Sequence, residues 1–373
     1  MATDGKWKQI ELTVRFLAPA FLGDAEQKGR WRTPPFKALL RQWWRVAYAA
    51  SQNFRVRVDE MRAKEGKLLG NAWLKQQVGG QIKSDFSRSL VRLRLEKWEQ
   101  GRLNSWERLE ARGIPHPDLY LGYGPLTARS TATVLKTPPA IEAGDQARLS
   151  LAVPEEEAPL VEQALALMHW YGTAGGRSRN GWGSFVLDPA PELKQPPLRD
   201  WRKALEWDWA HAIGRDENGP LVWVTVQQFA DWREAMRALA VLKVAIRTQF
   251  GWSPSQQQNQ PEPRHWLAYP VTNHPYPQWA SDKLRLPNSL RFKLRPAEDG
   301  PGKLVAVIFH MPCLPPDEFG AARHRPAIEN TWRQVHALLD ELVKPADCDR
   351  IYPSLHAGVR QELGKLSLQR IGR

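Results

Sequence analysis

The sequence contains little cysteine: two residues among 373, Cys313 and Cys348. Two thiols are too few for a disulfide framework or a cysteine-rich zinc site. Long apolar runs are also missing, since no stretch approaches the roughly 20 apolar residues that a membrane span needs. The polar N-terminus shows no signal-peptide core. These absences predict a protein of a reducing cytoplasm that does not contact a membrane.

Catalytic and nucleotide-binding motifs are missing as well. No glycine-rich stretch ends in the Gly-Lys-Ser or Gly-Lys-Thr of a P-loop. The histidines are scattered: His310, Cys313 and His324 are close, but no fourth metal ligand follows at a suitable spacing. No Ser-His-Asp or Cys-His pairing can be argued from spacing. His169 could act as a general base in RNA cleavage, although its apolar helical surroundings favour a packed side chain. The sequence therefore predicts no catalytic residue, no metal and no cofactor.

Positive charge, in contrast, is in excess. Lysine and arginine number 53 against 40 acidic residues, which gives a formal net charge of +13. A soluble chain this basic usually binds a polyanion. The sequence also contains 18 tryptophans, which can stack on bases and are enriched in protein interfaces. Because these tryptophans are spread along the chain, we expect most of them in cores and subunit contacts.

The least ordinary stretch is a glycine-rich segment at residues 172–183, Gly-Thr-Ala-Gly-Gly-Arg-Ser-Arg-Asn-Gly-Trp-Gly, which we call the glycine loop. An apolar helical run precedes it and a short apolar strand follows. Glycine lets the backbone approach another group closely, and backbone N–H groups beside arginines can bind a phosphate. A helix C-cap with Gly172 at C′ explains one or two of the glycines. Since it does not explain Arg177 and Arg179, we favour a phosphate-binding loop.

A second basic element lies near the N-terminus. Thr33 followed by two prolines is typical of a helix start, and the helix is expected to run to about residue 50. Lys37, Arg41 and Arg45 are spaced by four, so they form a basic stripe beside its apolar face. No acidic residue lies four positions away from them. Both phosphate contact and a solvated helix face remain open for this stripe.

Hydrophobic periodicity predicts an α+β fold. The expected elements of the first half follow the order β-α-β-β-α-β, the ferredoxin-like or RRM-like arrangement, at residues 7–17, 33–50, 89–98, 146–153, 160–171 and 184–187. A proline-rich linker follows, and the second half repeats the order loosely. We therefore predict two ferredoxin-like domains in tandem: 1–190, with the glycine loop after its second helix, and a divergent 191–373.

Three finer expectations concern single segments. Residues 76–89 are expected to form a loop, and residues 265–271 a weak strand. Residues 289–296 alternate strictly, which predicts a strand with leucine and phenylalanine on one side and Arg291, Lys293 and Arg295 on the other.

Several motifs resemble the RAMP superfamily of CRISPR-associated proteins, most closely the first subunit of the Cmr (type III-B) effector complex. The likeness rests on Pro19-Ala20-Phe21-Leu22-Gly23, Pro34-Pro35-Phe36-Lys37, Leu40-Arg41-Gln42-Trp43-Trp44-Arg45 and Gly175–Gly183. Asn180 stands where a basic residue is common in that family. The likeness covers the first half, while the second half matches in strand order and at Leu284–Leu290.

The resemblance implies a non-catalytic, RNA-binding subunit that caps the filament of an antiviral effector complex near the 3′ end of the guide RNA. Its partners would be guide (CRISPR) RNA, target RNA and other RAMP subunits. The alternatives are a metal-independent endoribonuclease that processes CRISPR precursor RNA, and a subunit whose tryptophans serve protein contacts only. Some relatives cut RNA with a loop aspartate, for which Asp85 is a candidate by position. The residues expected at the RNA are Arg30, Arg32, Lys37, Arg41, Trp44, Arg45, Gly175, Gly176, Arg177 and Arg179.

Overall fold

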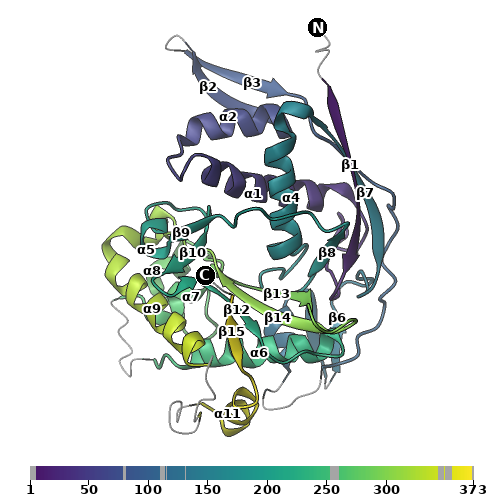
Figure 1. Cartoon of the computed structure of the whole chain (residues 1–373). Coiled ribbons are helices and arrows are strands. Elements are labelled where there is room, and N and C mark those ends of the chain that lie inside the picture. The colour runs from purple at the N-terminus through teal and green to yellow at the C-terminus, as the bar shows by residue number, and fades with distance from the viewer. Residues whose placement is uncertain are drawn as a thin grey trace. The chain divides into compact units, whose positions relative to one another are not determined.

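The computed structural model describes residues 6–78, 81–109, 114, 116–130, 132–252, 260–342, 348 and 355–371, without the side chains of 73–78 and 81–85. It has an α+β fold, as predicted (Figure 1). The chain divides into two compact units, of which the first contains Met1–Asn104, Thr137–Gly176 and Gly183–Pro197, and the second Ser105–Lys136, Arg177–Trp182 and Leu198–Arg373. This division differs from the expected single boundary after residue 190, because two segments of the first half pack with elements of the second.

A four-stranded antiparallel sheet organises the first unit, with the strand order β4-β7-β1-β8. Its strands are β1 (Trp7–Phe16), β4 (Arg92–Leu95), β7 (Gln146–Pro154) and β8 (Phe185–Asp188). Two helices, α1 (Thr33–Ser51) and α4 (Ala158–Tyr171), contact each other and the sheet (Figure 1). The 3-10 helix η1 (Glu155–Glu157) leads into α4. Along the chain these elements therefore follow the order β1, α1, β4, β7, α4, β8.

The core of this unit is aromatic. On β1, apolar and polar residues alternate, so Phe16 is fully buried while its neighbour Arg15 is exposed. The Phe16 ring centroid lies 5.2 Å from that of Trp31, 6.4 Å from Phe36 on α1 and 6.0 Å from Phe185 on β8. Such tilted ring pairs add to the free energy gained by burying the rings. Packing of these rings therefore fixes α1 on the sheet.

Between α1 and β4 the chain forms α2 (Val58–Leu69) and a hairpin of β2 (Asn71–Val78) and β3 (Gln81–Ser87). The expected loop at 76–89 is wrong, because most of this segment lies in the two paired strands. Strand pairing depends on backbone hydrogen bonds. Because this sequence is polar and shows no alternation of apolar and polar residues, its pattern does not predict the two strands.

The second unit contains a sheet of the same plan, with the antiparallel order β13-β14-β12-β15. Its strands are β12 (Val222–Thr225), β13 (Leu290–Pro296), β14 (Leu304–His310) and β15 (Leu368–Arg370). Helix α6 (Trp232–Thr248) follows β12, and α9 (Arg325–Glu341) follows β14. Strand by strand, this order along the chain and across the sheet is that of the first unit.

Shorter elements complete the second unit. They are α3 (Pro117–Gly122), β5 (Leu126–Arg129), β6 (Ala132–Leu135), β9 (Leu198–Asp200), α5 (Trp201–Ala204), β10 (Ile213–Asp216), β11 (Gly219–Pro220), α7 (Pro263–Leu267), α8 (Pro277–Ser281), η2 (Asp317–Phe319), η3 (Ala321–His324) and α11 (Ala357–Leu363). The weak strand expected at 265–271 is wrong, since α7 covers residues 265–267 and no strand follows within this range. Pro263 at its first turn and a capping box between Glu262 and His265 favour the helix.

The strand expected at 289–296 is confirmed, but both of its faces are covered. Arg291, Lys293 and Arg295 are 8%, 0% and 9% exposed. Burial lowers the pKa of the Lys293 amine well below its usual value, and the Arg295 charge adds to this effect. Alternation correctly predicts the strand, but it does not show that the basic face is buried as well.

Candidate nucleic-acid interface

The glycine loop is built from two parts, and the first packs within the first unit. There the loop lies on the Pro19–Gly23 turn: Gly176 N–H donates to Phe21 O at 2.9 Å, and Gly183 N–H donates to Pro19 O at 2.9 Å. Gly175 has a φ of +98°, and a Cβ on it would lie 2.7 Å from Phe21 O. These glycines therefore allow close backbone packing between two motifs that are far apart in the sequence.

This packing bears on the expected roles of Gly175 and Gly176. The N–H of Gly176 is already used inside the protein, whereas Gly175 is exposed. Gly172 ends α4 with a φ of −76°, so the helix does not end in a left-handed C-cap at this residue. In this part of the loop, the glycines allow the backbone to pack closely against the Pro19–Gly23 turn.

The second part of the loop, Arg177–Trp182, belongs to the second unit. Arg177 is exposed and has a φ of +55°. Its Nε donates to Tyr123 O at 2.6 Å. The Asn180 N–H donates to Arg177 O at 2.9 Å and closes a turn. The turn thus presents Arg177 at the surface beside the end of α3.

Arg179 anchors the same segment to the edge strand β13. Its carbonyl oxygen accepts from Phe292 N–H at 3.0 Å, and its Nη1 donates to Asn288 O at 3.2 Å. The side chain is half-buried, and burial lowers its pKa. Arg179 therefore holds the segment Arg177–Trp182 on the sheet of the second unit.

The basic stripe on α1 has an acidic partner that the sequence pattern does not reveal. Glu65 of α2 forms ion pairs with Arg41, at 3.2 Å, and with Arg45, whose Nη2 donates to Glu65 Oε1 at 2.8 Å. The Arg41 Nη2 also donates to the carbonyl oxygens of Leu69 and Gly70. Glu65 is 4% exposed. Two charges of the stripe are thus engaged within the first unit.

The remaining expected residues also lie in the first unit. Arg30 donates to the carbonyl oxygen of residue 98 at 3.1 Å and forms an ion pair with Asp24. Arg32 donates to the carbonyl oxygen of residue 23. Lys37 is half-buried, and burial lowers its pKa, as does the nearby Arg41 charge. Trp44 is 1% exposed and stacks on a tyrosine of its own helix, so its ring is part of the core.

Sequence reasoning misses one group of cations in the second unit. Lys243 and Arg247 lie over the ring of Tyr120, the Arg264 charge acts on Tyr120, and the Arg177 charge acts on Lys243; we call these five residues the Tyr120 cluster. One sign is visible in the sequence: Lys243 interrupts the apolar stretch 238–246 of an amphipathic helix, four residues before Arg247. That spacing places both on one side of α6.

The residues considered for chemistry lie in packed surroundings. Nδ1 of His169 is 3.1 Å from the carbonyl oxygen and 3.2 Å from the backbone nitrogen of Leu187. His310 is buried between Ser289, at 3.0 Å, and His336, at 2.9 Å. His324 lies against a tryptophan ring, and burial raises the pKa of Cys313. Asp85 lies on β3, and its side chain is outside the described part. No group of three or more His, Cys, Asp or Glu residues within the described ranges could hold a metal ion.

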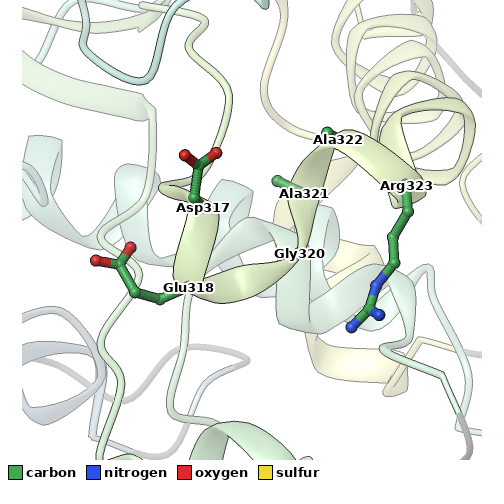
Figure 2. Close-up of a pocket in the computed structure, with 6 residues that line it drawn as sticks. All are labelled: Asp317, Glu318, Gly320, Ala321, Ala322 and Arg323. Carbon is green, nitrogen blue, oxygen red and sulfur yellow. The ribbon is translucent and has the colours of Figure 1, made fainter.

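A surface pocket of about 380 Å³ lies on η2 and η3 of the second unit. It is lined by Asp317, Glu318, Gly320, Ala321, Ala322 and Arg323. Figure 2 shows two carboxylates on one part of this wall and the Arg323 guanidinium on another. The two carboxylates disfavour binding of a phosphate, and none of the residues expected at RNA lines the pocket.

Among the described helices, none is long and apolar enough to cross a membrane.

Comparison with known proteins gives matches among solved structures. No protein-family model matches the chain. No curated protein matches it either. The fold is similar to the crystal structure of Cmr1 from Pyrococcus furiosus in its apo form, with 16% identity, 81% of this chain and 87% of that chain covered, and a TM-score of 0.41.

Proposed function

We propose that the chain is an RNA-binding structural subunit of a type III CRISPR RNA-guided effector complex, built from two ferredoxin-like domains in tandem. It caps the filament near the 3′ end of the guide RNA and contacts guide RNA, or the guide–target duplex, and neighbouring RAMP subunits. The observation that carries the proposal is the repeated plan: sheet orders β4-β7-β1-β8 and β13-β14-β12-β15, with a helix after the first and third strand of each. This is the plan of ferredoxin-like domains.

Two further observations support it. The Pro19–Gly23 turn and the glycine loop, which carry the resemblance to RAMP proteins, form hydrogen bonds with each other in the first unit. The two motifs therefore pack together in the folded first unit. The net charge of +13 fits a polyanionic partner.

Among the expected contact residues, Arg177 fits phosphate contact best, since it is exposed and sits on a turn. Arg30, Arg32 and Lys37 are half-buried, and we place them beside an RNA strand that passes over α1. Arg41 and Arg45 must first exchange Glu65 for a phosphate. Trp44 stays in the core, so we do not assign it base stacking.

The test is filter binding of a guide-like RNA over a salt series. Because phosphate contacts release counterions, the affinity should fall steeply as salt rises. Arg177→Ala should weaken binding and reduce the salt slope by about one. Arg333→Ala is the matched control, since Arg333 is an exposed arginine on α9. Wild-type protein that binds no RNA would contradict the proposal.

The enzyme alternative is tested with the same protein. It is incubated with CRISPR repeat RNA in EDTA, which removes metal-dependent contaminants. We expect intact RNA. Discrete product bands that disappear in His169→Ala would favour a metal-independent endoribonuclease instead.

A further inference from the structure

In the Tyr120 cluster, two cations of α6 lie over one aromatic ring, and cations of two other segments lie near enough for their charges to act on this group. Lys243 Nζ lies 5.4 Å from the Tyr120 ring centroid, and the Arg247 guanidinium lies 6.0 Å from it. Arg264, from α7, is close enough for its charge to act on both Tyr120 and Arg247, and the Arg177 charge acts on Lys243. All five residues belong to the second unit.

Lys243 is the most buried member of the cluster. It is 9% exposed, and its hydrogen-bond partner is a neutral group, Asn180 Oδ1, at 3.0 Å. A buried ammonium without an opposite charge is unfavourable, and neighbouring like charges add to the penalty. Consistent with this, burial, together with the charges of Arg247 and Arg177, lowers the pKa of Lys243 to about 7.

Negative charge near the cluster is scarce. Among the described residues, Glu262 is the carboxylate whose charge acts on Arg264, and no carboxylate charge acts on Lys243. Arg247 and Arg264 are half-buried and Arg177 is exposed, so the cluster reaches the surface. A cluster of this kind stores unfavourable electrostatic energy that an arriving anion would relieve.

We propose that the Tyr120 cluster binds a phosphate group of the RNA strand, an inference that rests on the proposed function. The guanidinium groups of Arg247 and Arg264 supply N–H donors suited to phosphate oxygens. Lys243 adds a further positive charge from the buried side of the cluster. Asn180 of the glycine loop holds the Lys243 amine in position through their hydrogen bond. The loop thus acts on RNA through Arg177 and also through the position of Lys243.

The test compares three proteins by filter binding of a guide-like RNA at several salt concentrations. These are the wild type, Arg247→Gln, and the control double variant Arg285→Gln/Arg333→Gln, which loses two exposed cations of the second unit outside the cluster. We expect Arg247→Gln to weaken binding about tenfold and to reduce the salt slope by about one, whereas the control changes little.

Stability gives the second readout. Removing the Arg247 charge relieves repulsion on Lys243, so Arg247→Gln should unfold at the same or a higher urea concentration than the wild type. Weaker RNA binding without loss of stability supports the inference. If the wild type binds RNA and Arg247→Gln binds as well as the control, this inference is overturned while the proposed function stands. If the wild type binds no RNA, both the proposed function and this inference are contradicted.

Discussion

Lys243 Nζ donates a hydrogen bond of 3.0 Å to Asn180 Oδ1, and each of the two residues is 9% exposed. The other side of the same amide donates from Nδ2 to Leu121 O at 2.7 Å. Asn180 therefore joins the segment Arg177–Trp182 to α3 and α6 within the second unit. A basic residue at this position would place a like charge beside Lys243. An asparagine satisfies both partners without adding charge.

Asn180→Ala should therefore destabilise the protein. It leaves a buried ammonium and a buried carbonyl oxygen without these partners, at a cost of about 2–4 kcal/mol. Urea unfolding followed by tryptophan fluorescence measures the change. Ser178→Ala in the same loop is the control, and it should change the free energy of unfolding by less than about 0.5 kcal/mol. Equal effects of the two substitutions would argue against a structural role for the Asn180 bonds.

The lowered pKa of Lys243 predicts how stability depends on pH. The folded state holds this pKa at about 7, whereas an unfolded lysine titrates near 10.4. Between these values the unfolded state binds more protons, so the free energy of unfolding rises with pH, by up to about 1.4 kcal/mol per pH unit. The charged groups that face Lys243 are the guanidinium groups of Arg177 and Arg247, and the raised pKa of Tyr120 keeps its hydroxyl neutral.

Urea unfolding at pH 7, 8 and 9 tests this prediction. Lys243→Met keeps most of the side-chain volume and removes the titrating group. The wild type should gain stability relative to Lys243→Met as the pH rises. Parallel stability curves for the two proteins over this range would contradict the prediction.

Hydrophobic periodicity in the sequence was sufficient to predict the strands and helices of the first sheet and those of the second except β15. The basic stretch 351–373 was not assigned from the sequence. Periodicity works because burial of one face leaves a regular pattern, as in β1 and α1. The order of these elements along the chain then limited the fold to few arrangements.

The charged partners could not be predicted in the same way. Glu65 lies on a different helix from Arg41 and Arg45, so a search for acids four positions away does not find it. The Tyr120 cluster draws residues from α3, the glycine loop, α6 and α7. Contacts between distant segments follow from tertiary packing and have no local spacing.

Gly183 is expected to tolerate no side chain. Its φ is +64°, and a Cβ there would lie 1.9 Å from Ala174 O. Gly144 is a matched control in the same unit, since its φ of +90° is also unfavourable for alanine but nothing lies within 4 Å of a Cβ. Gly144→Ala should cost about 1–2 kcal/mol for the left-handed backbone.

Gly183→Ala should cost clearly more, because the overlap forces the loop away from its hydrogen-bonded position. Thermal unfolding of both variants measures the difference. A similar loss of stability in the two proteins would mean that the loop adjusts to a side chain at residue 183.

Glu65→Gln tests whether the stripe on α1 is available to RNA. The substitution removes the carboxylate that pairs with Arg41 and Arg45 and should cost about 1–2 kcal/mol of stability. It also removes the group that competes with phosphate for the two guanidinium groups. If RNA passes over α1, the variant should bind guide-like RNA several-fold more tightly at low salt, with a steeper salt slope.

The control is Glu60→Gln, at an exposed position on the same helix. It removes an equal charge but leaves the ion pairs of Glu65 with Arg41 and Arg45 intact. Since general electrostatic attraction would raise the RNA affinity of both variants equally, only a larger gain in Glu65→Gln assigns the stripe to RNA. Equal affinities would leave Arg41 and Arg45 as structural links between α1 and α2.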